Sequence, residues 1–131
     1  MVSEIKVDKI SQTSSSGSII FGNAVIPSTY TGSGLTLDFD TYQNFIITLS
    51  SGANTLAQPS TEASNVGQTG IIVFIQPSSS SAGTVSLHGD YETVHSGGLT
   101  LTETNSAYDI VPYFIKADNS ILLGTPQRAF G

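Results

Sequence analysis

The residue types best suited to chemistry gather in one short segment of the chain, HGDYETVH, at positions 88–95. It carries two imidazoles and two carboxylates, from His88, Asp90, Glu92 and His95. Side chains of these types can hold a divalent metal or place a base beside an acid. Gly89, however, favours a turn between His88 and Asp90, and His95 falls on the opposite strand parity. The spacing matches no motif with a known mechanism, so we interpret the segment as an exposed polar hairpin.

An enzyme of the jelly-roll type that holds a metal through His88 and His95 remains an alternative, and it would carry metal when purified. Asp38 and Asp40 share a strand face and could form a carboxylate pair or a calcium site. The loop pattern of an EF-hand is absent, and a solvated strand face explains the pair as well. The chain also has no GxSxG elbow, and its TGSG segment precedes a strand rather than a helix. We therefore expect no catalytic residue, no metal site, no cofactor and no enzymatic activity.

The composition restricts the partners of the chain. Its 131 residues carry a net charge of −6, and only 11% of them are charged. The four basic residues are scattered, which argues against nucleic acid, because phosphate binding requires clustered Lys and Arg. No cysteine is present, no apolar run reaches the length of a membrane span, and the first residues lack the pattern of a secretion signal. Neither nucleic acid nor a membrane is an expected partner, and synthesis in a cytoplasm is expected.

Apolar residues alternate with polar ones through most of the chain, which is the period of a strand. The pattern predicts half-buried strands at 35–40, 44–50, 84–89 and 98–103, and a strand apolar on both faces at 71–75. Segments rich in Gly, Ser and Asn separate them, as turns do. We predict an all-β fold, an antiparallel β-sandwich or a jelly-roll-like domain, with an extended N-terminal arm.

The most apolar segment, YDIVPYFIKADNSILL, predicts a hairpin of two strands at 108–116 and 120–123. Asp118 and Asn119 suit its turn, and Pro112, which lacks an N–H group, is expected at an edge or a bulge. One face of this hairpin should build the core, while the other packs on a partner. We expect the partner face to consist of Val111, Tyr113 and Ile115.

The chain divides by its patterns into an arm at 1–30, a β domain at 31–124 and a tail at 125–131. Within the arm, Ile5, Val7 and Ile10 are expected to contact a neighbouring subunit, because a lone strand is stabilised by adding to the edge of another sheet. Low charge suits an interface core. Assembly into a trimer or a dimer is therefore expected.

From position 42 onward, the order of short motifs resembles that of a family of small bacteriophage virion domains, found in tail-fibre-like and capsid-decorating proteins. The motifs are NTLAQPS at 54–60, VGQTGIIVFIQ at 66–76, AGTVSLHGDY at 82–91, SGGLTL at 96–101 and AYDIVPYFIKADNSILLG at 107–124. The N-terminal segment is also similar to the short lead-in repeats of phage fibres. The resemblance covers about two thirds of the chain.

The resemblance implies a structural protein of the virion, assembled in the host cytoplasm. The first role that the resemblance implies is a capsid decoration or cement protein, which binds the major capsid protein or other virion proteins. The alternative is a tail or tail-fibre component that binds host glycan. A glycan site would use exposed aromatic side chains, for which the chain offers Tyr30, Tyr42, Tyr91, Tyr108 and Tyr113, although tyrosines in strands are more often half-buried.

Overall fold

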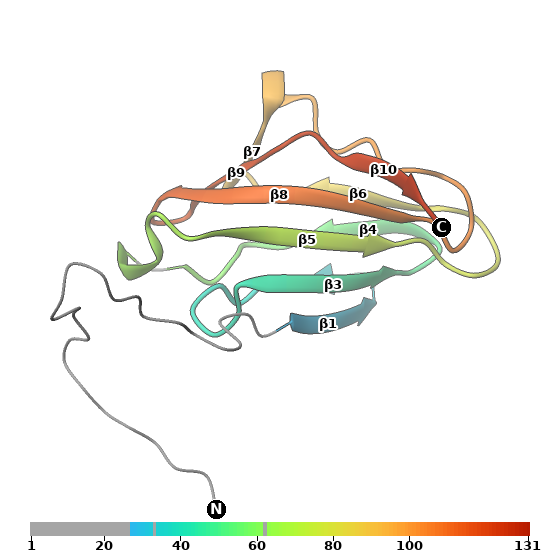
Figure 1. Cartoon of the computed structure of the whole chain (residues 1–131), viewed down its shortest axis with the longest axis horizontal. Coiled ribbons are helices and arrows are strands. Elements are labelled where there is room, and N and C mark those ends of the chain that lie inside the picture. The colour runs from blue at the N-terminus through green and yellow to red at the C-terminus, as the bar shows by residue number, and fades with distance from the viewer. Residues whose placement is uncertain (1–26, 33, 62) are drawn as a thin grey trace, which may run out of the picture.

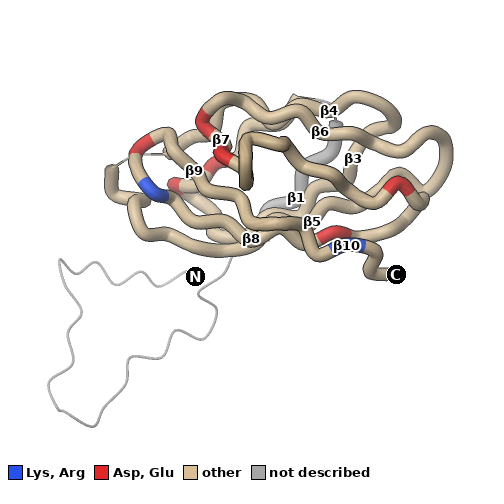
Figure 2. Tube along the Cα trace, turned by 90° about the horizontal axis from the view of Figure 1, so that it is seen from above, with Lys and Arg blue, Asp and Glu red and all other residues tan. Residues whose placement is uncertain are grey.

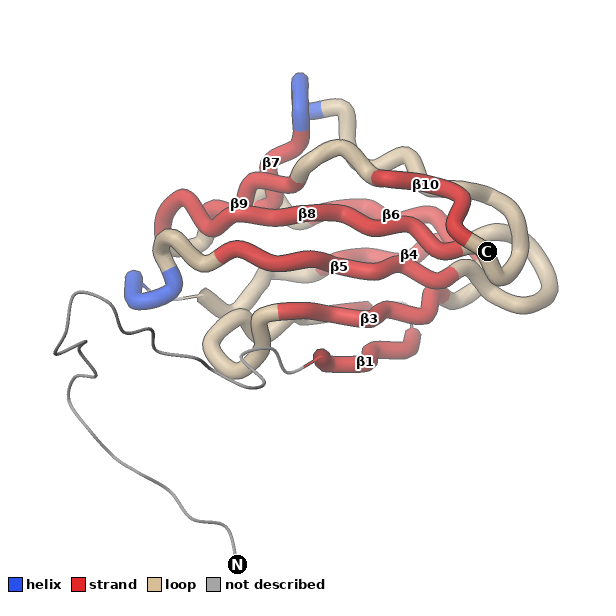
Figure 3. Tube along the Cα trace, in the orientation of Figure 1, coloured by secondary structure: helices blue, strands red, loops and turns tan. Residues whose placement is uncertain are grey.

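The computed structural model describes residues 27–32, 34–61 and 63–131, and for 27–32 it describes the backbone only. Strands form most of this part of the chain and belong to two sheets (Figures 1 and 3). The larger sheet contains β1 (Pro27–Gly32), β3 (Asn44–Leu49), β5 (Thr69–Ile75), β7 (Tyr91–Thr93), β8 (Tyr108–Ala117), β9 (Ser120–Leu123) and β10 (Gln127–Phe130). The smaller sheet contains β2 (Gly34–Leu35), β4 (Gly52–Leu56) and β6 (Gly83–Leu87). The all-β prediction is confirmed.

Helical structure is limited, in the described residues, to two single turns, η1 (Ala63–Asn65) and η2 (Val94–Ser96). Neither of them is an apolar helix of membrane-spanning length.

The chain coils between the two sheets. Each of the strands β1, β3 and β5 is followed by a strand of the smaller sheet, namely β2, β4 and β6. Equivalent strands of successive coils pair in parallel, as β1-β3-β5 in one sheet and β2-β4-β6 in the other. In Figure 1 the larger sheet lies in front and β4 and β6 lie behind it. Successive coils therefore stack on one another, which is the arrangement of a β-solenoid.

An antiparallel hairpin closes one end of this stack. β8 pairs antiparallel with β5 along the length of that strand, and β9 returns along β8. β7 pairs in parallel with β9 and completes the order β1-β3-β5-β8-β9-β7. β10 pairs with the first residues of β8, so that β9 and β10 follow one another along the same side of that strand. The 108–116 and 120–123 strands of the sequence prediction are thus β8 and β9.

The core lies between the sheets and draws inward-facing residues from both. Phe45, Ile47 and Leu49 alternate with half-buried residues along β3, and Leu35 and Leu56 approach from the smaller sheet. Burial of each such side chain stabilises the fold by about 1.5–3 kcal/mol.

Buried amides hold the corners at which the chain changes sheets. The side chain of Asn54 is 1% exposed. Its Oδ1 accepts the N–H of Ser50 at 2.9 Å, and its Nδ2 donates to the carbonyls of Ser50 and Thr84 at 2.8 and 3.2 Å. At the next corner, Gln76 forms a reciprocal pair of bonds with the backbone of Gly83, at 2.7 and 3.0 Å. Because backbone groups at a corner leave the ladder, these amides satisfy polar groups that would otherwise be buried without partners.

The structure corrects several sequence predictions. Pairing is mixed rather than antiparallel, because the short connections lead to the opposite sheet instead of forming hairpins. Residues 98–103 form no strand, although Leu101 is buried. The segment predicted as a tail, 125–131, contains β10, which belongs to the larger sheet. In addition, β1 runs across the predicted boundary between positions 30 and 31.

Candidate functional site

The most distinctive surface is the side of the larger sheet that points away from the core, on β5, β8, β9 and β10. We call it the outer face. Cross-strand pairs place Tyr108 beside Ile75 and Phe130, and Ile110 beside Val73. Its apolar residues are Ile71, Val73, Ile75, Tyr108, Ile110, Pro112, Phe114, Leu122 and Phe130, and the same register places the polar Thr69 and Gln127 on this side.

The outer face is apolar and exposed. Five of its large side chains keep a large share of their surface open: Ile71 40%, Tyr108 42%, Phe114 45%, Leu122 37% and Phe130 45%. Scattered exposed apolar residues are normal, whereas contiguous patches of several hundred Å² mark interaction sites. Here the cross-strand register makes these residues neighbours on one surface.

Charge is confined to the margin of the outer face. Among the outward positions of β5, β8 and β9, all of which are described, Lys116 is the one charged residue. Its Nζ donates to both carboxylate oxygens of Glu92, at 2.7 and 2.9 Å, and Ser120 Oγ donates to the same carboxylate at 2.5 Å. The hydrogen bond from Lys116, followed by that from Ser120, holds the pKa of Glu92 below its usual value. In Figure 2 the middle of β5 and β8 is free of charged residues, whereas an acidic and a basic residue lie together where β10 runs beside β8.

A shallow hollow lies beside the largest side chains of the outer face. Its volume is about 290 Å³, and its lining includes Pro112, Phe114, Leu122 and Gly124. A Cβ atom on Gly124 would lie 2.7 Å from Cγ of Pro112, so this glycine keeps the hollow open. The N–H of Gly124 donates to the carbonyl of Pro112 at 2.8 Å, where the chain passes from β9 to β10. Pro112 thus lies at a break in the ladder, where no N–H group is needed.

The prediction of which face of the hairpin meets a partner is wrong, because the exposed residues of β8 are the alternate ones. Val111, Tyr113 and Ile115 are 0%, 3% and 0% exposed, because they point into the core of their own chain. The hydroxyl of Tyr113 lies inside, where it donates to the carbonyl of Gln43 at 2.5 Å and accepts from Nε2 of Gln68 at 3.0 Å. Burial raises the pKa of Tyr113, and the bond from Gln68 offsets part of that effect.

The residues of β8 and β9 that alternate with these buried ones contribute to the outer face. The arm residues that complete the predicted interface, Ile5, Val7 and Ile10, lie outside the described residues.

The histidine and carboxylate segment does not converge on one point. Nδ1 of His88 lies 3.3 Å from Oδ1 of Asp90, whereas Glu92 binds Lys116. His95 is exposed on η2 with a positive φ of 55°. Among residues 27–32, 34–61 and 63–131, no three His, Asp or Glu side chains are grouped as metal ligands would be.

The aspartate pair at 38 and 40 stabilises a turn. Oδ1 of Asp38 accepts the N–H groups of Asp40 and Thr41, both at 3.1 Å. Oδ2 of Asp40 accepts from the hydroxyl of Ser60 at 3.0 Å. These bonds give both carboxylates a structural role, as in an Asx turn.

The tyrosines do not form a common platform in the described residues. Tyr91 and Tyr113 are buried, Tyr42 is half-buried, and Tyr108 is exposed on the outer face. Tyr30 belongs to β1, of which only the backbone is described.

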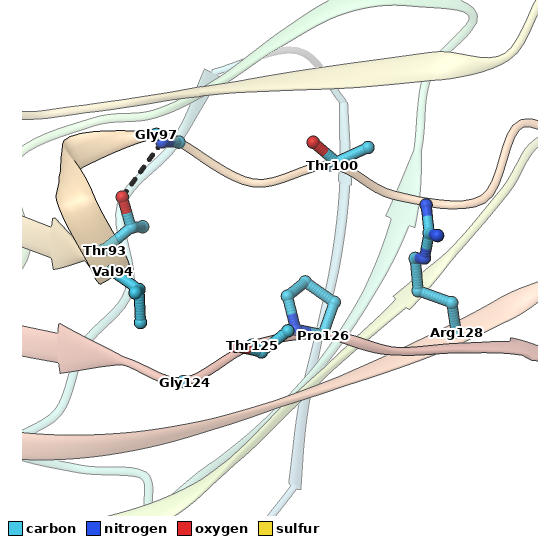
Figure 4. A pocket seen from close by; sticks show the side chains of 9 residues that line it. Thr93, Val94, Gly97, Thr100, Gly124, Thr125, Pro126 and Arg128 are labelled. Carbon is cyan, nitrogen blue, oxygen red and sulfur yellow. Dashed lines mark hydrogen bonds between the residues drawn. The ribbon is translucent and has the colours of Figure 1, made fainter.

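Sequence reasoning missed a second surface feature, a pocket of about 360 Å³ beside β10. It opens where the chain leaves β7, between η2 and the segment that leads into β10 (Figure 4). Thr93, Thr100, Thr125 and Arg128 supply its polar groups, and Oγ1 of Thr93 accepts the N–H of Gly98 at 2.9 Å. The lining contains no acid and no imidazole, so it offers no acid–base pair for catalysis.

The role of Asp109 also escaped sequence reasoning. This carboxylate is 2% exposed and lies beneath the outer face. It accepts the N–H and the hydroxyl of Thr102 at 2.5 and 2.8 Å, and the N–H of Ala129 at 2.9 Å. Asp109 therefore ties the loop at 98–103 and β10 to β8, which fixes the position of Phe130 at the edge of the outer face.

Comparison of the chain with protein-family models, with curated proteins and with solved structures found no match.

Proposed function

We propose that this chain is a structural protein of a bacteriophage virion, a decoration or cement protein that assembles through its outer face. The observation that carries the proposal is the contiguous apolar surface on β5, β8, β9 and β10, on which Lys116 is the one charged residue among the outward positions of β5, β8 and β9. Interface cores are poor in charge and rich in aromatic residues, and this surface has both properties. The motif order that resembles virion domains supplies the biological setting.

The proposal includes a second contact, made by the arm at 1–30 through Ile5, Val7 and Ile10. In it, the arm adds a strand to a sheet edge of the major capsid protein, of another virion protein or of a neighbouring copy. The outer face and the arm would then be two separate assembly contacts of the chain, and acting together they strengthen assembly without requiring either contact to be tight.

A tail or tail-fibre component that binds host glycan is the second candidate. It is favoured by the three exposed aromatic rings of the outer face, those of Tyr108, Phe114 and Phe130, because such rings can stack on sugars. Sugar hydroxyls, however, also need polar partners, and the outer face offers few. The surface therefore fits a protein partner better than a glycan.

The number of copies per particle separates these candidates. We expect gel densitometry of purified phage particles to give a count comparable to that of the major shell protein, as lattice decoration requires. A few tens of copies or fewer would contradict decoration and place the chain in a tail or fibre. Complete absence from the particle would overturn both virion roles.

A further inference from the structure

We propose that the partner of the outer face is a second copy of this chain, packed sheet against sheet about a two-fold axis. The inference deepens the proposed function and rests on it in one respect, namely that the outer face is an assembly surface. It adds the identity of the partner.

The outer face has a shape that is complementary to itself. Phe114 and Leu122 project from it, and the hollow beside them lies over Pro112 and Gly124. A two-fold interface uses the same patch on both subunits, so a projection and a recess must occur on one surface. In the proposed dimer, a two-fold axis beside the hollow would set the exposed Phe114 and Leu122 of each copy against the hollow of the other.

The charge distribution of this surface is compatible with self-association. Each copy carries a net charge of −6, so two copies repel one another in most orientations. The outer face adds little local repulsion to this, because the middle of β5 and β8 has no outward charged side chain and Lys116 at the margin is bound to Glu92. A partner of opposite charge is not required by anything on this surface.

The exposed area is large enough for a modest dimer. Five side chains that are each about 40% exposed present roughly 400 Å² of apolar surface. Val73, Ile75 and Ile110, which are half-buried on the same face, extend it toward the roughly 800 Å² per partner of a standard interface. Packed faces of sheets also lie about 10 Å apart, a distance that side chains of this size fill.

Sedimentation equilibrium of the purified full chain, from about 1 µM to about 1 mM, tests the proposal. We expect a reversible dimer. The double variant Phe114→Thr/Leu122→Thr should raise the dimer dissociation constant by at least about 100-fold, because two-fold symmetry removes each contact twice. Threonine suits strands, so the variant should keep the thermal unfolding midpoint of the parent within a few degrees.

The matched control is Val66→Thr/Val94→Thr. These valines are 48% and 60% exposed and lie off the outer face, so their replacement should leave the dissociation constant within about twofold. If the parent chain stays monomeric over the whole concentration range, the proposal that the partner is a second copy is wrong. It is also wrong if the Phe114→Thr/Leu122→Thr variant dimerises as tightly as the parent chain.

These outcomes are separable from those for the proposed function. A monomeric chain whose incorporation into particles still depends on Phe114 and Leu122 would mean that the face binds another virion protein, and only the dimer proposal would fail. A dimer formed through this face by a chain that is absent from particles would overturn the virion role alone.

Discussion

Tyr113 shows how one side chain connects the hairpin to the coils. Its ring packs edge-on against Phe39, with centroids 5.0 Å apart, and its hydroxyl bonds to Gln43 and Gln68. Gln68 Nε2 also donates to the carbonyl of Tyr42 at 3.2 Å. The phenol is therefore held in its neutral form, inside the protein, at the junction of β3, β5 and β8.

Because of this environment, the free energy of unfolding should change with pH in the alkaline range. Burial raises the pKa of Tyr113 in the folded state above 10.0, whereas the unfolded chain ionises near that value. The stability that the buried Tyr113 phenol contributes is thus fully present below pH 10. It is lost as the pH rises through the pKa of Tyr113 in the folded state. We expect Tyr113→Phe to lower the free energy of unfolding by about 1–3 kcal/mol at neutral pH, because its partners lose a bond.

Urea unfolding at pH values from about 8 to 11 measures this effect. The difference in stability between the parent and Tyr113→Phe should shrink as the pH rises above 10. Tyr108→Phe, at an exposed site on the same strand, serves as the control and should follow the parent. A difference that stays constant with pH would contradict the account of Tyr113.

Sequence alone identified the residue types capable of chemistry, but not their neighbours. His88, Asp90 and Glu92 are close together in the sequence, yet the bond from Lys116 to Glu92 joins positions 24 apart. The three donors to Asp109 are likewise supplied by two other segments. Such partners depend on strand register, and no local pattern encodes it.

At the scale of elements, alternation predicted the strands better than their pairing. The segments at 44–50, 71–75, 108–116 and 120–123 correspond to β3, β5, β8 and β9. The segment at 108–116 is apolar on both faces, so its pattern does not say which face is buried, and alternation carries no information on the direction of the neighbouring strand. The error in parity at Val111, Tyr113 and Ile115 and the missed parallel coils share this physical cause.

Glycine at the coil corner offers a test of the coiled arrangement. A Cβ atom on Gly83 would lie 2.7 Å from Cβ of Leu49 and 2.8 Å from the carbonyl oxygen of Ser50, which belong to the preceding coil. We expect Gly83→Ala to lower the free energy of unfolding by about 1–3 kcal/mol, as overpacking of a close contact does.

Chemical denaturation of Gly83→Ala against Gly34→Ala gives the comparison. Gly34 is also in a strand, but no atom lies within 4 Å of its Cβ position, so its replacement should change stability by no more than about 0.5 kcal/mol. Equal effects of the two substitutions would contradict the close approach of successive coils.

At the scale of the whole molecule, the described residues combine stacked coils with an apolar outer face. The hairpin of β8 and β9 covers one end of the stack and also supplies most of that face. Few charges surround it, and the ion pair between Lys116 and Glu92 lies at its border. We propose that this surface packs against other protein, which is the central claim of the proposed function.

Incorporation of variants into phage particles tests that claim most directly. Particles assembled with Phe114→Thr/Leu122→Thr in place of the parent chain are purified, and the copies retained are counted by gel densitometry. Val66→Thr/Val94→Thr is treated in parallel, since those valines are exposed elsewhere. We predict that particles keep at most about one tenth as many copies of the outer-face variant as of the parent chain, because a tenfold weaker contact at limiting concentration lowers occupancy about tenfold. The control variant should be retained at the parent level. Retention of both variants at the parent level would contradict assembly through the outer face.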